Sequence, residues 1–167
     1  MAASKEEKNV RPNGIFISYG REDEVTKFVL QLKHDLEANG YSVWLDLESI
    51  PAGSDWHGAI GTALQECSAI IPIVAQKYLG SRYCMNELYT ADGEKKAIFP
   101  IVYEDVDLAS TEAGRGLKYI ISGINWTMFR PDKDDYGDSL QKLIKGINEK
   151  GSCMLGYSSC KLSAHLC

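Results

Sequence analysis

Short apolar runs alternate with longer amphipathic stretches along most of this chain. Four of the runs are apolar at nearly every position, which is typical of parallel strands buried on both faces. They occupy residues 15–18, 41–45, 69–74 and 97–102. A shorter strand is predicted at 124–126. Because Pro72 has no backbone N–H, we expect the strand that contains it to lie at a sheet edge or to bulge there.

The stretches between these strands carry apolar residues at helical spacing. The first is the clearest, since the acidic pair Glu22 and Asp23 opens it and Asn39-Gly40 closes it. Its inward face consists of Val25, Phe28, Val29, Leu32 and Leu36. Further helices are predicted over residues 55–66, 85–94 and 136–150. Residues 104–122 are polar and are expected to be irregular, with one helical turn at most.

Strands that alternate with amphipathic helices predict a parallel sheet covered by helices on both faces. In such open sheets, ligands bind outside the carboxyl ends of the strands. The loops that are expected to matter are therefore 19–22, 46–54, 75–84 and the chain from 103 onward. None of them carries a glycine motif that cradles phosphate. This argues against a standard dinucleotide-binding fold and against a phosphate-loop enzyme.

Length and charge narrow the classes of protein further. At 167 residues the chain is long enough for one stable domain. We expect a disordered lead-in over 1–12, a domain over 13–150 and a flexible tail over 151–167. The net charge of −5 argues against nucleic acid or an anionic membrane as the main partner. No apolar run reaches the ~20 residues of a membrane helix, and the polar N-terminus lacks a secretory signal, so we predict a cytoplasmic protein.

The five cysteines do not predict a metal site. Cys67 and Cys84 lie inside patterned segments and are interpreted as small core residues. Cys153, Cys160 and Cys167 lie in the tail with six residues between neighbours, whereas metal knuckles use closer pairs. We interpret these three as free thiols.

Glu87 is the most prominent candidate for chemistry. It lies in the first turns of a predicted helix, in the segment Ser81-Arg82-Tyr83-Cys84-Met85-Asn86-Glu87-Leu88. Glutamate is seldom fully buried without a partner. From the residues alone, Glu87 is either a charge that interacts with the positive end of the helix or a site residue.

Three motifs, in this order, resemble those of Toll/interleukin-1 receptor (TIR) domains. Residues 16–23, Phe-Ile-Ser-Tyr-Gly-Arg-Glu-Asp, resemble the opening box. Residues 40–46, Gly-Tyr-Ser-Val-Trp-Leu-Asp, followed by 50–53, Ile-Pro-Ala-Gly, resemble the second strand and the BB loop. The segment around Glu87 resembles the box after the third strand, most strongly in plant-type and NAD-cleaving members. Phe129 resembles a weaker third box, and the resemblance runs from about residue 13 to 150.

The resemblance implies a flavodoxin-like open sheet of about five parallel strands with helices on both faces. The family contains adaptors that only assemble and enzymes that split NAD+. The enzymes carry a glutamate at the position of Glu87 and cut the bond between nicotinamide and ribose, giving ADP-ribose or a cyclic isomer. NAD+ is then the substrate, and no metal or other cofactor is needed. This chain departs from the pattern in two places: Tyr83 stands where many members have Trp, and Pro51 occurs in many adaptors.

With Glu87 as the catalytic residue, the resemblance implies these substrate-binding residues: Phe16, Ser18, Tyr19, Arg21, Asp46, Trp56, Tyr83 and Cys84. Several also have a structural interpretation. Phe16 is typical of the core, and Cys84 is interpreted as packing because its motif has no histidine to activate it. Tyr19 and Arg21 either contact a flat ring or phosphate, or are solvated loop residues. Asp46 either caps its loop or lines the pocket.

Two aromatic residues have alternative interpretations, and the BB loop keeps a non-catalytic function open. Trp56 either packs on the BB loop or lines the pocket, and Tyr83 either borders the nucleotide or fills the edge of the core. Assembly is assigned to the BB-loop residues Glu48, Ile50, Pro51, Ala52 and Gly53. The main hypothesis is a TIR-type NAD+ glycohydrolase in innate-immune or cell-death signalling, activated by association with itself or with other TIR domains. The alternative is a non-catalytic adaptor that acts through TIR–TIR contacts.

Overall fold

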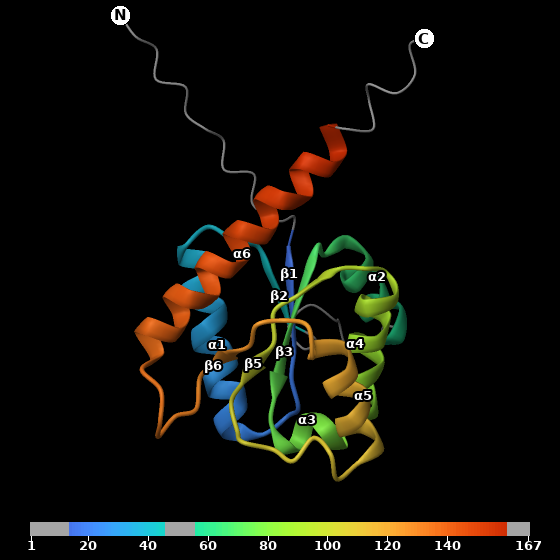
Figure 1. The fold of residues 1–167 in the computed structure, drawn as a ribbon, viewed down its shortest axis with the longest axis vertical. Helices are drawn as coiled ribbons and strands as arrows, with labels where there is room; N and C mark the ends of the chain where they lie inside the picture. The colour runs from blue at the N-terminus through green and yellow to red at the C-terminus, as the bar shows by residue number, and fades with distance from the viewer. Residues whose placement is uncertain (1–13, 46–55, 160–167) are drawn as a thin grey trace, which may run out of the picture.

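A parallel sheet forms the centre of the molecule (Figure 1). The computed structural model describes residues 14–45 and 56–159. The strands are β1 (Ile15–Ser18), β2 (Val43–Leu45), β3 (Ala69–Val74), β4 (Ala97–Ile98), β5 (Ile101–Val102) and β6 (Thr127–Met128). Their order is β2-β1-β3-β5-β6, with β4 also paired to β3, and each pairing is parallel. The predicted flavodoxin-like open sheet is confirmed.

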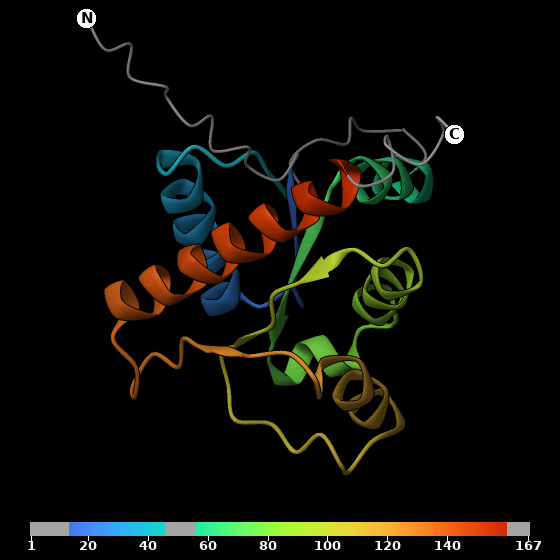
Figure 2. The ribbon, with the colours of Figure 1, turned by 45° about the horizontal axis from the view of Figure 1, so that its top comes forward.

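Helices cover both faces of this sheet (Figures 1 and 2). One face is covered by α1 (Asp23–Ala38) and α6 (Tyr136–Ser159), and the other by α2 (Trp56–Glu66), α3 (Gln76–Gly80), α4 (Arg82–Gly93) and α5 (Glu112–Ile121). Successive strand residues point to opposite faces, so each face has its own core. Ile15 and Ile17 enter the core on the α1/α6 face, whereas Phe16 enters the core on the α2–α5 face.

The pattern of apolar residues predicts best where its spacing is regular. Helix α1 begins directly after Glu22. Four of its five predicted inward residues are buried, and Phe28 is partly buried against the same core. Helix α2 begins one residue after the predicted start and ends where predicted, at Glu66. Cys67 and Cys84 are both buried, as expected of core residues.

Strand β3 is central, so the prediction of an edge position for Pro72 is wrong. The register against its neighbour is the same before Pro72, at Ala69↔Ala97, and after it, at Val74↔Val102, so the described ladder contains no bulge either. Instead, the neighbouring strand is divided into β4 and β5 around Phe99 and Pro100. Neither proline has an N–H to donate, so the ladder is interrupted where they face each other and then resumes in register.

Helix α4 begins three residues earlier than predicted. The hydroxyl of Ser81 accepts a hydrogen bond from the backbone N–H of Cys84 at 3.3 Å, which caps the helix and sets its start at Arg82. The short helix α3 precedes it, in a segment that was expected to be a loop. Together, α3 and α4 occupy the carboxyl end of β3, where the sequence places its most distinctive motif.

Helix α5 is a full helix where one turn at most was expected. The side chain of Thr111 accepts a hydrogen bond from the backbone N–H of Gly114 at 3.0 Å, and Leu117 and Ile121 are fully buried. Gly114 and Gly116 lower the helix propensity of this segment, so propensity alone does not predict the helix. A Cβ at Gly114 would lie 2.6 Å from the carbonyl oxygen of Leu108, so the close packing requires glycine.

The last two elements are also displaced from their predicted positions. Strand β6 starts at Thr127, because the indole N–H of Trp126 donates to the carbonyl oxygen of Ile121 at 2.9 Å and ties that residue to the end of α5. Helix α6 continues past Lys150 to Ser159, and no proline interrupts it. No helix in the described part of the chain is both long and apolar enough to cross a membrane.

Candidate active site

Glu87 is a buried acid on the second turn of α4. It is only 5% exposed, and no other Asp, Glu, Lys or Arg among the described residues is buried. Burial of a carboxylate is unfavourable unless hydrogen bonds compensate for the lost water. The helix dipole acts mainly on the first turn, which in α4 carries no acid, so it does not account for a buried acid on the second turn. The burial of Glu87 therefore favours a site residue over a simple helix-start charge.

Ser18 supplies a hydrogen bond to this carboxylate. It is the last residue of β1 and is fully buried, and its Oγ lies 2.5 Å from Oε2 of Glu87. The serine hydroxyl donates this hydrogen bond, and the carboxylate oxygen accepts it. Two predicted site residues that are far apart in the sequence thus meet where β1 ends.

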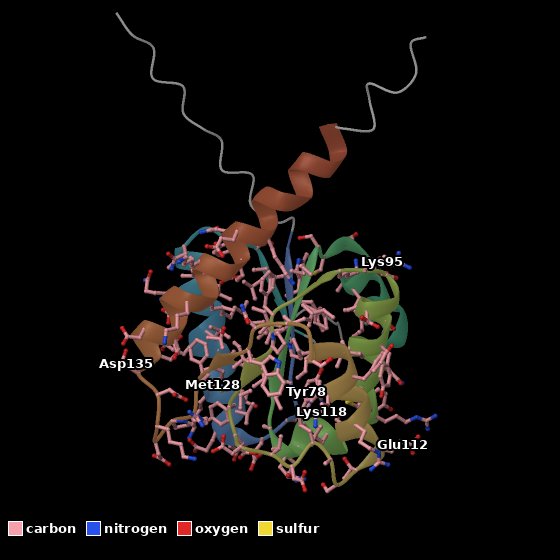
Figure 3. All side chains as sticks on the ribbon, in the orientation of Figure 1. Tyr78, Lys95, Glu112, Lys118, Met128 and Asp135 are labelled. Carbon is pink, nitrogen blue, oxygen red and sulfur yellow. The ribbon has the colours of Figure 1, made fainter. Side chains whose placement is uncertain are left out.

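Tyr78 on α3 completes the cluster, although the sequence analysis did not single it out. Its side chain is fully buried, and its hydroxyl oxygen lies 3.2 Å from Oγ of Ser18 and 3.2 Å from the carbonyl oxygen of Cys84. Burial, followed by the nearby Cys84, raises the pKa of the phenol well above 10, so Tyr78 keeps its proton. Figure 3 labels Tyr78 near the lower end of the sheet, beside α3. Its place in the 75–84 loop after the third strand was the available signal.

A close backbone contact packs the end of β1 against α3. A Cβ at Gly20 would lie 2.7 Å from the carbonyl carbon of Lys77 and 2.8 Å from the backbone nitrogen of Tyr78. Both atoms belong to the backbone, so any larger residue would have to displace α3. Glycine at this position therefore allows Tyr78 to reach the Ser18–Glu87 pair.

The other predicted substrate-binding residues do not all gather at this cluster. Phe16 is buried in the α2–α5 core, as expected, and Cys84 is 3% exposed. Tyr19 is also buried, but in the core on the opposite face, so the interpretation as a solvated loop residue is wrong. Arg21 is exposed, and Tyr83 is 49% exposed and does not fill the edge of the core.

The remaining predicted positions cannot be placed. Asp46 and the BB-loop residues Glu48, Ile50, Pro51, Ala52 and Gly53 lie outside the described residues. Trp56 is the first residue of α2, but its side chain is not among those described. The roles that the resemblance implies for these residues stay predictions.

Glu87 is not among the residues that line the two largest surface pockets described. One of about 650 Å³ is lined by Phe99, Trp126 and lysines of α6, and one of about 640 Å³ lies between Tyr89 of α4 and Glu112 of α5. Over residues 14–45 and 56–159, no group of three or more His, Cys, Asp or Glu side chains is placed to hold a metal ion. The chemistry that the described residues offer at the cluster is that of a carboxylate and two neutral hydroxyls.

Sequence comparison adds a family and a relative. The family model for the TIR domain matches residues 15–144. Over 91 residues, the chain is 33% identical to the probable 2′ cyclic ADP-D-ribose synthase BdTIR of Brachypodium distachyon. The matched part covers 54% of this chain and 40% of that protein, so the chain matches less than half of its relative's length.

Solved TIR structures share the fold. The TIR domains of the activated Roq1 resistosome, which directly recognises the pathogen effector XopQ, superpose with a TM-score of 0.66 at 18% identity, covering 81% of this chain and 99% of theirs. The heterodimer of the RPS4 and RRS1 TIR domains gives 0.52 at 14% identity, covering 81% of this chain and 96% of that one. At these identities the likeness shows the fold alone. Because the family model covers most of the residues that form the sheet and its helices, the chain belongs to the TIR domain family.

Proposed function

We propose that this TIR domain is an NAD+ glycohydrolase that cleaves the bond between nicotinamide and ribose. The proposal rests on the buried Glu87 carboxylate, which accepts a hydrogen bond from Ser18 at 2.5 Å where β1 ends. In an open parallel sheet, ligands bind at that edge. A buried charge is weak evidence for a stabilising role, and perturbed or desolvated acids cluster at functional sites.

The chemistry needs one well-placed negative charge. As nicotinamide leaves, positive charge develops on the ribose ring, and a nearby carboxylate stabilises this oxocarbenium-like transition state more than the ground state. Nicotinamide departs as a neutral molecule, so no acid has to protonate it. Water then attacks the anomeric carbon and releases a proton, which gives ADP-ribose. Attack by a nucleophile of ADP-ribose itself gives a cyclic isomer, an outcome that the name of the Brachypodium relative supports.

The surroundings of Glu87 strengthen its effect on a bound sugar. The side chain lies beside an apolar core that includes Phe16, Ile70 and Leu88, all of them at most 1% exposed. In a medium of low polarity, a charge acts on its neighbours more strongly than it does in water. The Ser18 hydroxyl fixes Oε2 at the carboxyl end of β1, so less reorganisation is needed when the ribose becomes charged.

We infer that assembly activates the enzyme and that it signals in innate immunity or cell death. The Roq1 resistosome and the RPS4–RRS1 heterodimer are assemblies of TIR domains, which supports association of this chain with itself or with other TIR domains. If a neighbouring copy contributes to the pocket, the fraction of active enzyme rises with protein concentration. The cytoplasmic location and the contribution of the BB loop remain predictions from the sequence.

The test is NAD+ turnover by the purified chain at high micromolar concentration, with and without a crowding agent. Nicotinamide and the adenine-containing products are separated by chromatography, and the Glu87→Ala variant is treated identically. We expect nicotinamide release by the native chain alone, with a yield per molecule that rises as the protein assembles. The retention time of the second product distinguishes ADP-ribose from a cyclic isomer.

The controls separate catalysis from folding and from assembly. Circular dichroism and light scattering must show that Glu87→Ala folds and assembles like the native chain. Full activity in that folded variant would refute the assignment of Glu87. Intact NAD+ in samples that scatter as assemblies would instead support the non-catalytic adaptor.

A further inference from the structure

The geometry points to Tyr78 as a positioning residue for Glu87. We infer that its hydroxyl donates to the oxygen of Ser18 and thereby directs the single proton of Ser18 onto the carboxylate of Glu87. The kinetic consequence of this inference rests on the proposed NAD+ cleavage. Its structural consequence, the orientation of the Ser18 hydroxyl, does not.

The direction of the hydrogen bonds follows from the number of protons. Ser18 has one hydroxyl proton, and it donates that proton to Oε2 of Glu87 in the short contact of 2.5 Å. The contact of 3.2 Å between the two hydroxyl oxygens can then be a hydrogen bond only if Tyr78 donates. The carbonyl oxygen of Cys84, also 3.2 Å away, shares the same phenolic proton.

The phenol is fixed in position and in protonation state. Tyr78 is fully buried in the α2–α5 core, and the N–H of Ser81 donates to its backbone carbonyl at 3.1 Å. Gly20 lies directly against its backbone nitrogen. Because burial keeps the phenol neutral, Tyr78 remains a hydrogen-bond donor throughout the physiological pH range. A fixed neutral donor is suited to orient a serine hydroxyl, which otherwise rotates freely about its C–O bond.

Removal of the phenolic oxygen should therefore act through Ser18. In Tyr78→Phe the ring still fills its place in the core, but the oxygen of Ser18 loses its donor, and the hydrogen bond to Glu87 weakens. We expect kcat for nicotinamide release to fall about three- to ten-fold, as for the loss of one ordinary hydrogen bond, with little change in KM. A residue that served only in packing would leave kcat unchanged once the fraction of folded protein is taken into account.

The experiment combines a spectroscopic signal with a double-mutant cycle. Proton NMR at low temperature should show a slowly exchanging, downfield hydroxyl proton, which is assigned to Ser18 by its loss in Ser18→Ala. In Tyr78→Phe this resonance should move upfield and exchange faster. Tyr41→Phe is the matched control, because it removes a buried phenolic hydroxyl that donates to Asn148 at 2.6 Å on the other face of the sheet. That control should leave both the resonance and kcat unchanged.

Two results would overturn the inference. The first is a native spectrum without a Ser18 hydroxyl resonance, or a resonance that Tyr78→Phe leaves unchanged. The second is additive losses of kcat in Ser18→Ala and Tyr78→Phe, since a residue that acts through Ser18 has no further effect once that hydroxyl is gone. If the native chain releases no nicotinamide while the resonance still responds to Tyr78→Phe, the proposed function fails and the positioning role stands.

Discussion

Each face of the sheet holds a carboxylate that accepts a hydrogen bond from a hydroxyl, and the two carboxylates differ in their exposure. On the α1/α6 face, the hydroxyl of Tyr136 donates to Asp35 at 2.6 Å, and Asp35 is partly exposed. On the α2–α5 face, the hydroxyl of Ser18 donates to Glu87 at 2.5 Å, and both residues are buried. The first carboxylate stays in contact with water, whereas the second is enclosed by the core.

This difference separates a structural pair from a candidate site. Hydrogen bonds from Gln31 and then Tyr136 lower the pKa of Asp35, so the pair favours the charged form of that acid and the native state at neutral pH. Glu87 gains its hydrogen bond only after losing most of its hydration, and a buried charge of this kind is often less stable than an apolar residue of similar size. The hydrogen-bonded acid on the α1/α6 face therefore contributes to stability, whereas the α2–α5 face retains a buried carboxylate, that of Glu87, which stability alone does not require.

Glu87→Gln should produce the largest effect. The amide has nearly the same shape but lacks the negative charge, so we expect nicotinamide release to fall by about a thousand-fold, or ~4 kcal/mol in the activation barrier. The free energy of unfolding should stay within ~1 kcal/mol of the native value or rise. Chromatography of nicotinamide and urea unfolding measure the two quantities. A large loss of stability together with full activity would reverse the roles assigned to the two faces.

Leu36→Ala should produce the opposite result. Leu36 is fully buried in the core on the α1/α6 face, and its truncation leaves a cavity, so we expect a loss of about 2–5 kcal/mol in the free energy of unfolding. Turnover per folded molecule should be unchanged. Urea unfolding measures the free energy of unfolding. The chromatographic assay, corrected for the folded fraction, measures the turnover. A specific loss of turnover would show that the two faces are coupled.

Gly20→Ala should affect both stability and turnover. The added methyl group must displace the backbone of α3, so we expect a loss of about 1–3 kcal/mol in stability and a fall in nicotinamide release as Tyr78 moves. Gly123→Ala is the matched control, because a Cβ there meets no atom within 4 Å. Equal effects of the two substitutions on turnover would contradict the proposed packing of the site.

Tyr136→Phe tests the structural pair on the α1/α6 face. Asp35 loses one hydrogen bond but remains in contact with water, so we expect a loss of about 1 kcal/mol in the free energy of unfolding at pH 7. Nicotinamide release should not change. A fall in turnover without a change in stability would place Tyr136 in the catalytic machinery and weaken the comparison.

The smallest expected effect is the pH dependence of the stability lost in Tyr136→Phe. Because the pKa of Asp35 is lowered in the folded state, its contribution is fully present above the ordinary value of 3.8 and disappears as the pH falls through the lower, folded value. The stability difference between the native chain and Tyr136→Phe should thus shrink below about pH 4. Urea unfolding from pH 6 to pH 2.5 measures it. A difference that grows toward low pH would contradict the sign.

The sequence predicts the regular parts of the fold and two of the three members of the cluster, Glu87 and Ser18. The spacing of Val25, Val29, Leu32 and Leu36 is enough to define α1, because apolar periodicity reports burial on one face of a helix. Prediction from the sequence fails for α5, because Gly114 and Gly116 lower the helix propensity. Only the tertiary contact with Leu108 explains why residue 114 is glycine. The prediction also fails at Pro72, because β3 is a central strand and its hydrogen-bond ladder is interrupted at the proline.

The site divides in the same way. The motif around Glu87 is a local signal and can be read from the sequence, as can the position of Ser18 at the end of a strand. Tyr78 and Gly20 could not be assigned roles, because the roles come from contacts that form only when α3 folds against the end of β1. The burial of Tyr19 was not predicted either, because the alternation of side chains continues past the end of β1 and directs Tyr19 into the core on the opposite face.

The most direct test of the central claim is real-time proton NMR of NAD+ mixed with the assembled native chain, with Glu87→Ala measured in parallel. Free nicotinamide has resonances distinct from those of NAD+, so its appearance reports cleavage of the bond in question. The predicted result is a steady rise of nicotinamide with the native chain and none with the folded variant. Unchanged NAD+ in the presence of native assemblies, or equal cleavage by both proteins, would contradict the claim that the buried carboxylate of Glu87 splits NAD+.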